Sequence, residues 1–217
     1  MFAFAVYRDL KITRRLITDL RRHYPTADLI CLADGNPDAE FAHFCQLHQV
    51  KFQPHQKRLK LPQHGGLWLE RLFSDALLHS DAPHFVKTEG DTRFWRPFAD
   101  LPQTDVAGTL NTRRSITFPR GGCVYLKRSA IVKILASGLL RDKKYCNNSR
   151  FSYGRYTEYR YADEAIEAQP ILLADLVLGD VIRRLKLSLS NWREVSIAFR
   201  STPAPRNFAA THPHHDH

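Results

Sequence analysis

Two carboxylates separated by one glycine are the residues of this sequence best suited to chemistry. Glu89 and Asp91 follow the apolar run His84–Lys87, which predicts that they stand at the end of a strand. Residues i and i+2 of an extended segment project to the same side, so both carboxylates would enter one site. Paired oxygen ligands suit Mg²⁺ or Mn²⁺, which can bridge carboxylates to a diphosphate. The alternative is a strand-end turn whose acids are solvated.

Several familiar catalytic motifs are absent from the chain. The sequence has no G-x-G-x-x-G after its first apolar run, no G-x-x-x-x-G-K-[ST], no H-E-x-x-H and no G-x-S-x-G. Dehydrogenases, P-loop enzymes and serine hydrolases therefore lose most of their support.

The elements that must position the two carboxylates alternate regularly up to residue 92. Apolar runs predict strands, and apolar residues at helical spacing predict helices. The expected strands are 2–7, 27–33, 50–53 and 84–87, and the expected helices are 9–23, 39–48 and 67–78. This alternation predicts an α/β layer fold with a mainly parallel sheet. Glu89 and Asp91 would then lie at the carboxyl edge of the sheet, where ligands bind in such folds.

The second half of the chain is less regular. The expected elements there are strands 105–110 and 122–127 and helices 129–139 and 172–185. We expect irregular structure around Trp192 and a Pro- and His-rich tail after it. The segment 141–161 holds six Lys or Arg and six Phe or Tyr but only two acids, and its Asn and Gly residues favour a loop.

Four stretches of the sequence resemble the nucleotide-diphospho-sugar transferases, the GT-A-like glycosyltransferases. Gly65–Arg71 and His84–Thr92 carry the resemblance in the first half, where the family ends its strand in Asp-x-Asp. Gly121–Ala130 is similar to the family's Gly-Gly segment and following helix. Ala174–Gly179 is similar to a Glu-Asp-Val-Tyr-Leu-Gly motif, with Ala174 in place of the first acid.

The resemblance implies a fold and a reaction. The fold is α/β, a single GT-A-like (Rossmann-like) domain over residues 1–210 with a mainly parallel central sheet flanked by helices, followed by a His-rich tail at 211–217. The reaction is metal-dependent transfer of a sugar from a nucleoside-diphosphate donor to an acceptor, with Mn²⁺ or Mg²⁺ as cofactor. Two departures, Glu89 and Ala174, keep open a degenerate form of the fold that binds a nucleotide without turnover.

The resemblance also implies a set of metal ligands. Asp91 matches the second, usually metal-ligating, position of the Asp-x-Asp motif, and Glu89 occupies the first with one extra methylene. The segment Ala210–Pro213 resembles a C-terminal His-Pro segment that completes the metal site in many members, which makes His212 the third candidate ligand. The alternative for His212 is a disordered terminus whose histidines bind metal adventitiously.

Three further residues acquire roles from the resemblance. Asp175 would face the acceptor hydroxyl as a general base, although an Asp that opens an apolar helix also suits an N-terminal cap or a partner of the helix dipole. Asp34 and Arg8 end the first strands and would contact the nucleotide, with turn or surface positions as the alternative. Asp180, just over one turn after Asp175, is expected to be a solvated helix acid.

Charge and cysteine content limit the partners and the compartment. The 217 residues carry a formal net charge of +10, which favours anionic partners such as nucleotides, nucleic acid, lipid head groups or acidic sugars. A nucleic-acid-binding protein that uses the basic and aromatic segment 141–161 is therefore the competing hypothesis. Peripheral membrane association and an anionic acceptor also stay open. Four widely spaced cysteines and the lack of an apolar run of about 20 residues predict a cytoplasmic protein.

Overall fold

The first half of the chain alternates strands and helices as its periodicity predicts. The computed structural model describes residues 1–7, 10–35, 38–57, 59, 64–113, 115–142, 144–145, 173–199 and 207–214. Its first elements are β1 (Phe2–Val6), α1 (Leu10–His23), β2 (Leu29–Asp34), α2 (Ala39–Leu47), β3 (Val50–His55), α3 (Gly65–His79) and β4 (His84–Thr88). Every residue of β2 is buried, which is typical of a strand covered by helices on both faces.

The central sheet is mainly parallel, as expected. The later elements are β5 (Arg93–Phe94), β6 (Val106–Arg113), β7 (Ile116–Lys127), α4 (Arg128–Ala136), the 3₁₀ turn η2 (Leu139–Arg141), α6 (Ala174–Arg184), β8 (Leu189–Asn191), β9 (Val195–Phe199) and β10 (Ala210–His214). Within the described residues, seven strands form one sheet in the order β3-β2-β1-β4-β7-β6-β8. Only β7 runs against the others, since it is antiparallel to both β4 and β6.

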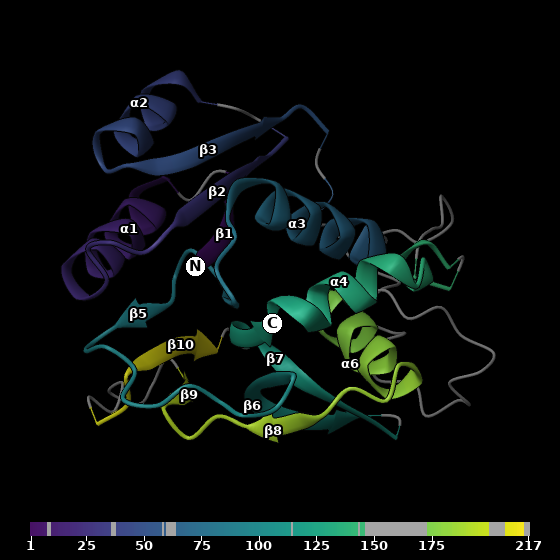
Figure 1. Ribbon diagram of the computed structural model, residues 1–217. Coiled ribbons are helices and arrows are strands. Elements are labelled where there is room, and N and C mark those ends of the chain that lie inside the picture. Colours follow the sequence, from purple (N-terminus) through teal and green to yellow (C-terminus); the bar gives the residue numbers. More distant parts are fainter. Residues whose placement is uncertain are drawn as a thin grey trace.

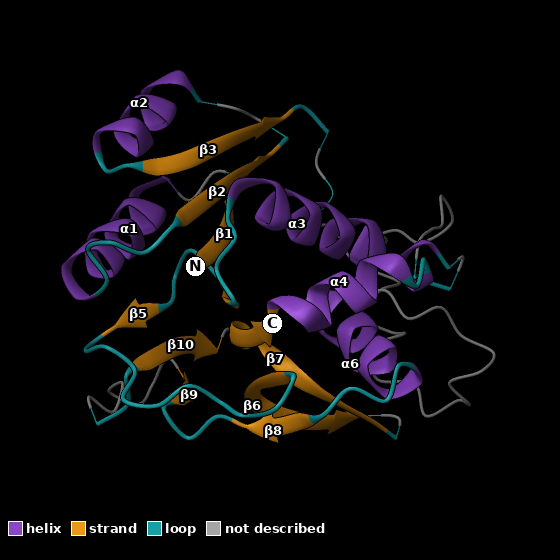
Figure 2. Cartoon of the chain, viewed as in Figure 1, coloured by secondary structure: helices purple, strands orange, loops and turns teal. Residues whose placement is uncertain are grey.

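Helices cover both faces of this sheet (Figure 2). Successive strand residues point to opposite faces, so Ala3 and Phe85 pack in the cluster that includes α3, α4 and α6, while Phe4 and Val86 pack toward α1 and α2. No helix in the described ranges is both long enough and apolar enough to cross a membrane.

A second, three-stranded sheet corrects the expectation of irregular structure around Trp192. Strands β8 and β9 flank this residue, and β10 pairs with β9 in parallel and with β5 in antiparallel fashion (Figure 1). These strands are not predicted from the sequence because they are short and their backbone groups form hydrogen bonds with segments that are distant along the chain. Pro213 also argues against a strand from sequence alone.

The three-stranded sheet bears on the expected division of the chain at residue 210. Residues 210–214 form β10, so the first part of the predicted tail takes part in a sheet. The division into a domain at 1–210 and a tail at 211–217 stays a prediction.

Candidate functional site

The two carboxylates of the Glu-Gly-Asp motif lie where β4 ends. β4 stops at Thr88, and the turn that follows is closed by the Thr92 amide, which donates to the Glu89 carbonyl at 3.0 Å. The Glu89 amide donates to Gly122 of β7 at 3.2 Å, which holds the turn against the neighbouring strand. Side chains of both Glu89 and Asp91 are partly exposed, at 26% and 20%. They are therefore held in place and still accessible to a ligand.

His212 joins these carboxylates from the far end of the chain. Its Nδ1 lies 3.1 Å from Asp91 Oδ1, and its Nε2 lies 3.8 Å from Glu89 Oε2. One ligand atom from each of the three residues lies within 4.8 Å of the others, so the cluster could hold a metal ion. The Thr92 hydroxyl, 3.3 Å from His212 Nδ1, supports the imidazole from the side.

The approach of His212 depends on a glycine in β7. A Cβ on Gly122 would lie 2.0 Å from Cγ of His212, far inside van der Waals contact. β10 can therefore cross this strand with its imidazole in the site only because residue 122 has no side chain. In the sequence, Gly121 and Gly122 were noted for their similarity to the family's Gly-Gly segment. The tertiary structure gives the physical reason for a glycine at position 122.

Asp175 reaches the same site from α6. A Cβ on Gly121 would lie 2.8 and 2.9 Å from the two Asp175 carboxylate oxygens and 2.9 Å from Glu89 Oε1, so both acids contact this glycine. Leu173 occupies the N-cap of α6 without a side-chain bond, and Asp175 lies inside the first turn. Asp175 is therefore not the N-cap residue, but its position in the first turn agrees with the other half of that alternative, a favourable interaction with the helix dipole.

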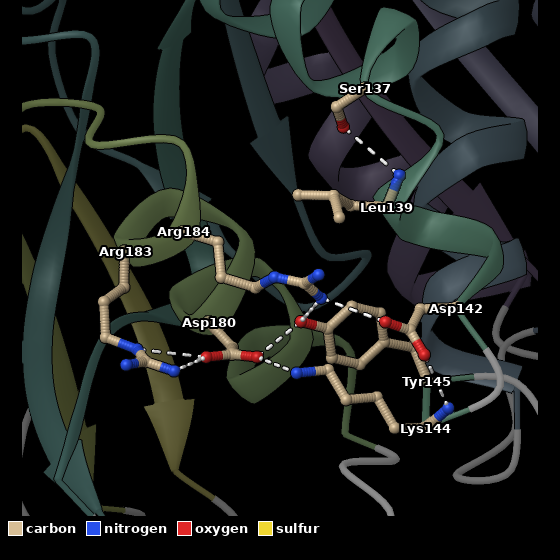
Figure 3. Close-up of polar contacts among 8 residues, drawn as sticks. All are labelled: Ser137, Leu139, Asp142, Lys144, Tyr145, Asp180, Arg183 and Arg184. Atoms are coloured by element: carbon tan, nitrogen blue, oxygen red, sulfur yellow. Dashed lines mark hydrogen bonds and ion pairs between the residues drawn. The ribbon is translucent and has the colours of Figure 1, made fainter.

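Asp180 lies on α6, the same helix as Asp175. The expectation that Asp180 is a solvated acid is wrong, because its side chain is buried and anchors the helix. The Asp180 side chain has no exposed surface and accepts hydrogen bonds from Lys144 Nζ at 2.8 Å, from Arg183 Nη2 at 2.6 Å and from the Tyr145 hydroxyl (Figure 3). Burial alone would raise the pKa of Asp180, but these hydrogen bonds outweigh it and lower the pKa to about 2. Asp180 is thus an ionised anchor.

The anchor also links α6 to the residues that precede segment 146–172. Arg184 donates to Asp142 at 3.0 Å (Figure 3). The Tyr145 carbonyl accepts from the Gly66 amide of α3 at 3.2 Å. Hydrogen bonds from Arg184 and Lys144 lower the pKa of Asp142 in spite of its partial burial, which acts in the opposite direction. Through these hydrogen bonds Tyr145 connects α3 to α6, which pack on the same face of the sheet.

Comparisons with known proteins extend these observations to the fold as a whole. No protein-family model matches this chain, and no curated protein matches it in sequence. Among solved structures it is similar to the galactosyltransferase LgtC, crystallised with donor and acceptor sugar analogs, with a TM-score of 0.52 and 9% identity. The superposition covers 98% of this chain and 86% of that chain.

The fold is GT-A-like. This confirms the expected fold class, a mainly parallel α/β sheet flanked by helices. At 9% identity the similarity supports the fold alone. An activity must be argued from the side chains of this chain.

The GT-A-like sheet places Asp34, a predicted nucleotide contact, at the carboxyl end of β2. Its side chain is buried and accepts from the Leu59 amide at 2.7 Å and from Arg71 Nη1 at 3.2 Å. Asp34 therefore organises the segment before α3 and the first turns of that helix. A contact with nucleotide stays a prediction. Arg8, the other predicted contact, lies outside the described residues, as do residues 146–161 of the basic and aromatic segment.

A charged residue of the site, Lys87, was not predicted from the sequence. Lys87 of β4 is buried, and its Nζ lies 3.6 Å from Glu89 Oε1 and 3.9 Å from Asp175 Oδ1. The sequence held a signal for it, because a lysine in a buried strand two residues before Glu89 must point to the same side as that acid. A buried ammonium also requires a partner.

Proposed function

We propose that this protein is a metal-dependent glycosyltransferase that moves a sugar from a nucleoside diphosphate to an acceptor hydroxyl. The observation that carries the proposal is the convergence of Glu89, Asp91 and His212 beside Asp175 at the carboxyl edge of a GT-A-like sheet. The sugar analogs in the similar LgtC structure support the same class of ligands.

The three residues fit a divalent cation. Two carboxylates and one imidazole offer hard oxygen ligands and one nitrogen, a set compatible with Mn²⁺ and, with more water, with Mg²⁺. Asp91, Glu89 and His212 would hold the ion. When bound, it would stabilise the negative charge that develops on the departing diphosphate.

The chain's own part in the reaction falls to Asp175. The bond between the anomeric carbon and the diphosphate oxygen breaks, and its electron pair leaves with the diphosphate. The acceptor oxygen forms the new bond to the anomeric carbon, and Asp175 accepts the proton that this oxygen loses. Its side chain is 32% exposed, so an acceptor hydroxyl can reach it. We keep Arg8 and Asp34 as proposed contacts to the nucleotide.

A thermal-shift panel tests the donor site. UDP, GDP, CDP, ADP and dTDP are each combined with Mn²⁺, Mg²⁺ or EDTA. A nucleotide at 100 times its Kd should raise the melting temperature by about 5 to 10 °C, because a ligand at that level adds about 2.7 kcal/mol. The shift should disappear in EDTA and in Asp91→Asn. Asp81→Asn, which changes a fully exposed acid, is the matched control and should keep it.

Two results of this panel would overturn the proposal. One is a cooperative melt that no nucleotide raises. The other is an equal rise in EDTA. In a separate titration, binding of single-stranded oligonucleotides that survives Asp91→Asn and weakens steeply with salt would favour nucleic-acid binding instead. Asp175→Asn separates binding from turnover, because it should keep the nucleotide shift and lose sugar transfer.

A further inference from the structure

The sequence resemblance assigned no role to Lys87, the buried cation of the site. Its side chain is buried in β4, between β1 and β7. The ammonium donates to the Gly121 carbonyl at 2.7 Å. Burial of an unpaired charge costs free energy, so the groups that contact this ammonium indicate its structural role.

The neighbours of Lys87 are two acids from different elements. Glu89 comes from the end of β4 and Asp175 from α6, and their carboxylates lie 3.6 and 3.9 Å from the Lys87 ammonium. Both acids also contact Gly121, since each has an oxygen within 2.9 Å of the position that its Cβ would occupy. Two carboxylates this close repel each other, and a cation beside both offsets the repulsion.

Glu89 has two oxygens that face different partners. Oε1 faces Lys87, while Oε2 faces His212 of the candidate metal cluster. One carboxylate therefore joins the metal ligands to the Lys87–Asp175 pair. Glu89 has one methylene more than an Asp would have at this position, and the longer side chain spans the distance between the metal ligands and the Lys87–Asp175 pair.

We propose that Lys87 is a positioning residue that holds Asp175 against Glu89 and thereby sets the distance between the acceptor-side acid and the metal ligands. The inference rests on the proposed function and deepens it. In this arrangement the Lys87 ammonium also offsets part of the negative charge near Glu89. It therefore lowers the affinity of the candidate metal cluster for a cation.

A double-mutant cycle in EDTA tests the link between Lys87 and Asp175 without metal or turnover. Lys87→Met should lower the melting temperature, because it leaves the two acids to repel each other. Asp175→Asn in the Lys87→Met background should raise it again, whereas Asp175→Asn alone should not stabilise the protein. Lys127→Met is the control, since it removes a lysine that bonds the Gln103 carbonyl at 2.6 Å, and Asp175→Asn should not rescue it.

Mn²⁺ binding, followed by electron paramagnetic resonance, gives the second readout. Lys87→Met should bind Mn²⁺ more tightly than the wild type, by roughly tenfold, because the competing cation is gone. Lys127→Met should leave the affinity unchanged. An unfolded or merely loosened variant would bind Mn²⁺ more weakly, so a structural role predicts the opposite sign.

The outcomes separate the two proposals. Equal effects of Asp175→Asn in both backgrounds, or unchanged Mn²⁺ affinity in Lys87→Met, would overturn the role of Lys87. If the wild type binds no Mn²⁺, the metal-dependent function fails, and the EDTA cycle still decides the role of Lys87. If Lys87→Met does not fold, recovery of folding by Asp175→Asn supports the inference, and failure to recover it overturns it.

Discussion

Single residues determine how closely the parts of this site approach one another. Gly122 lets the imidazole of His212 cross β7, and Gly121 lets the carboxylates of Glu89 and Asp175 meet. Neither glycine offers a ligand atom from its side chain. Both act by leaving space, which is why a substitution as small as alanine has a large expected effect.

Gly122→Ala is expected to displace His212 from the carboxylates. The added methyl group would overlap Cγ of the imidazole, so β10 must shift, at a cost of about 1–3 kcal/mol of stability. Mn²⁺ affinity should fall by about tenfold or more, measured by titration with paramagnetic detection. In a His212→Ala background the same substitution should cost little further affinity. A Gly122→Ala protein with wild-type Mn²⁺ affinity would show that His212 is not a ligand.

Whole elements are placed by charges that lie outside the reaction itself. α6 brings Asp175 to the site, and Asp180 on the same helix fixes α6 to Lys144 and Tyr145 (Figure 3). The Arg183 side chain, on the other side, completes the bonds to Asp180. The anchor is a carboxylate whose stability contribution depends on pH.

Asp180 is expected to stabilise the fold in a pH-dependent way. Its folded-state pKa of about 2 lies below the unfolded value of 3.8, so its contribution is present above pH 4 and is lost as the pH falls toward 2. The size is roughly 2 kcal/mol. Urea unfolding should show Asp180→Asn much less stable than the wild type at pH 6, with a gap that narrows below pH 4.

The comparison with Asp180→Asn isolates this one group. Asp105 and Glu194 also have lowered pKa values, and their contributions are common to both proteins because none of their hydrogen-bond partners contacts Asp180. Tyr145→Phe serves as the control, because it removes one of the hydrogen bonds to Asp180 together with the bond from Arg184 and keeps the carboxylate, so most of the pH dependence should remain. A gap between wild type and Asp180→Asn that stays constant from pH 6 to pH 3 would contradict the assigned ionisation.

The molecule as a whole joins a large sheet to a small one at the candidate metal cluster. Asp91 and Glu89 follow β4 of the large sheet, whereas His212 belongs to β10 of the small one. A cation held by all three would connect the two sheets, and the added ligand bonds would be present only in the folded state.

Mn²⁺ is therefore expected to protect β10 against hydrogen exchange. The amides of residues 210–212 and 214 should exchange more slowly in Mn²⁺ than in EDTA, while those in the middle of β2 should not change. Asp91→Asn should abolish the difference, and Asp81→Asn should keep it. Equal slowing across both sheets would point to a general effect of the salt and not to a cation at this site. Mass spectrometry of peptides that span β10 measures the effect.

Much of the fold followed from local patterns. The β-α alternation to residue 92 and the parallel sheet depend on periodicities of 2.0 and 3.6 residues, which short stretches of sequence contain. The expected extended segment at Glu89–Asp91 is wrong, because these residues lie in a turn that the Thr92 amide closes on the Glu89 carbonyl, and this turn brings the two carboxylates to one site. The three-stranded sheet did not follow, because its short strands are stabilised by pairing across the chain.

The sequence by itself determined the strands and helices up to residue 88 and the edge of the large sheet at which the Glu-Gly-Asp motif stands. The resemblance named His212 as a third ligand, but only the tertiary structure decided that this residue, 120 residues beyond Thr92, lies beside that pair. The tertiary structure alone also decided that Lys87 lies between Glu89 and Asp175 and that Asp180 is buried. Periodicity is local, whereas ion pairing and close approach depend on which distant surfaces meet. The packing of β10 and α6 on β7 made that choice, and with it the composition of the site.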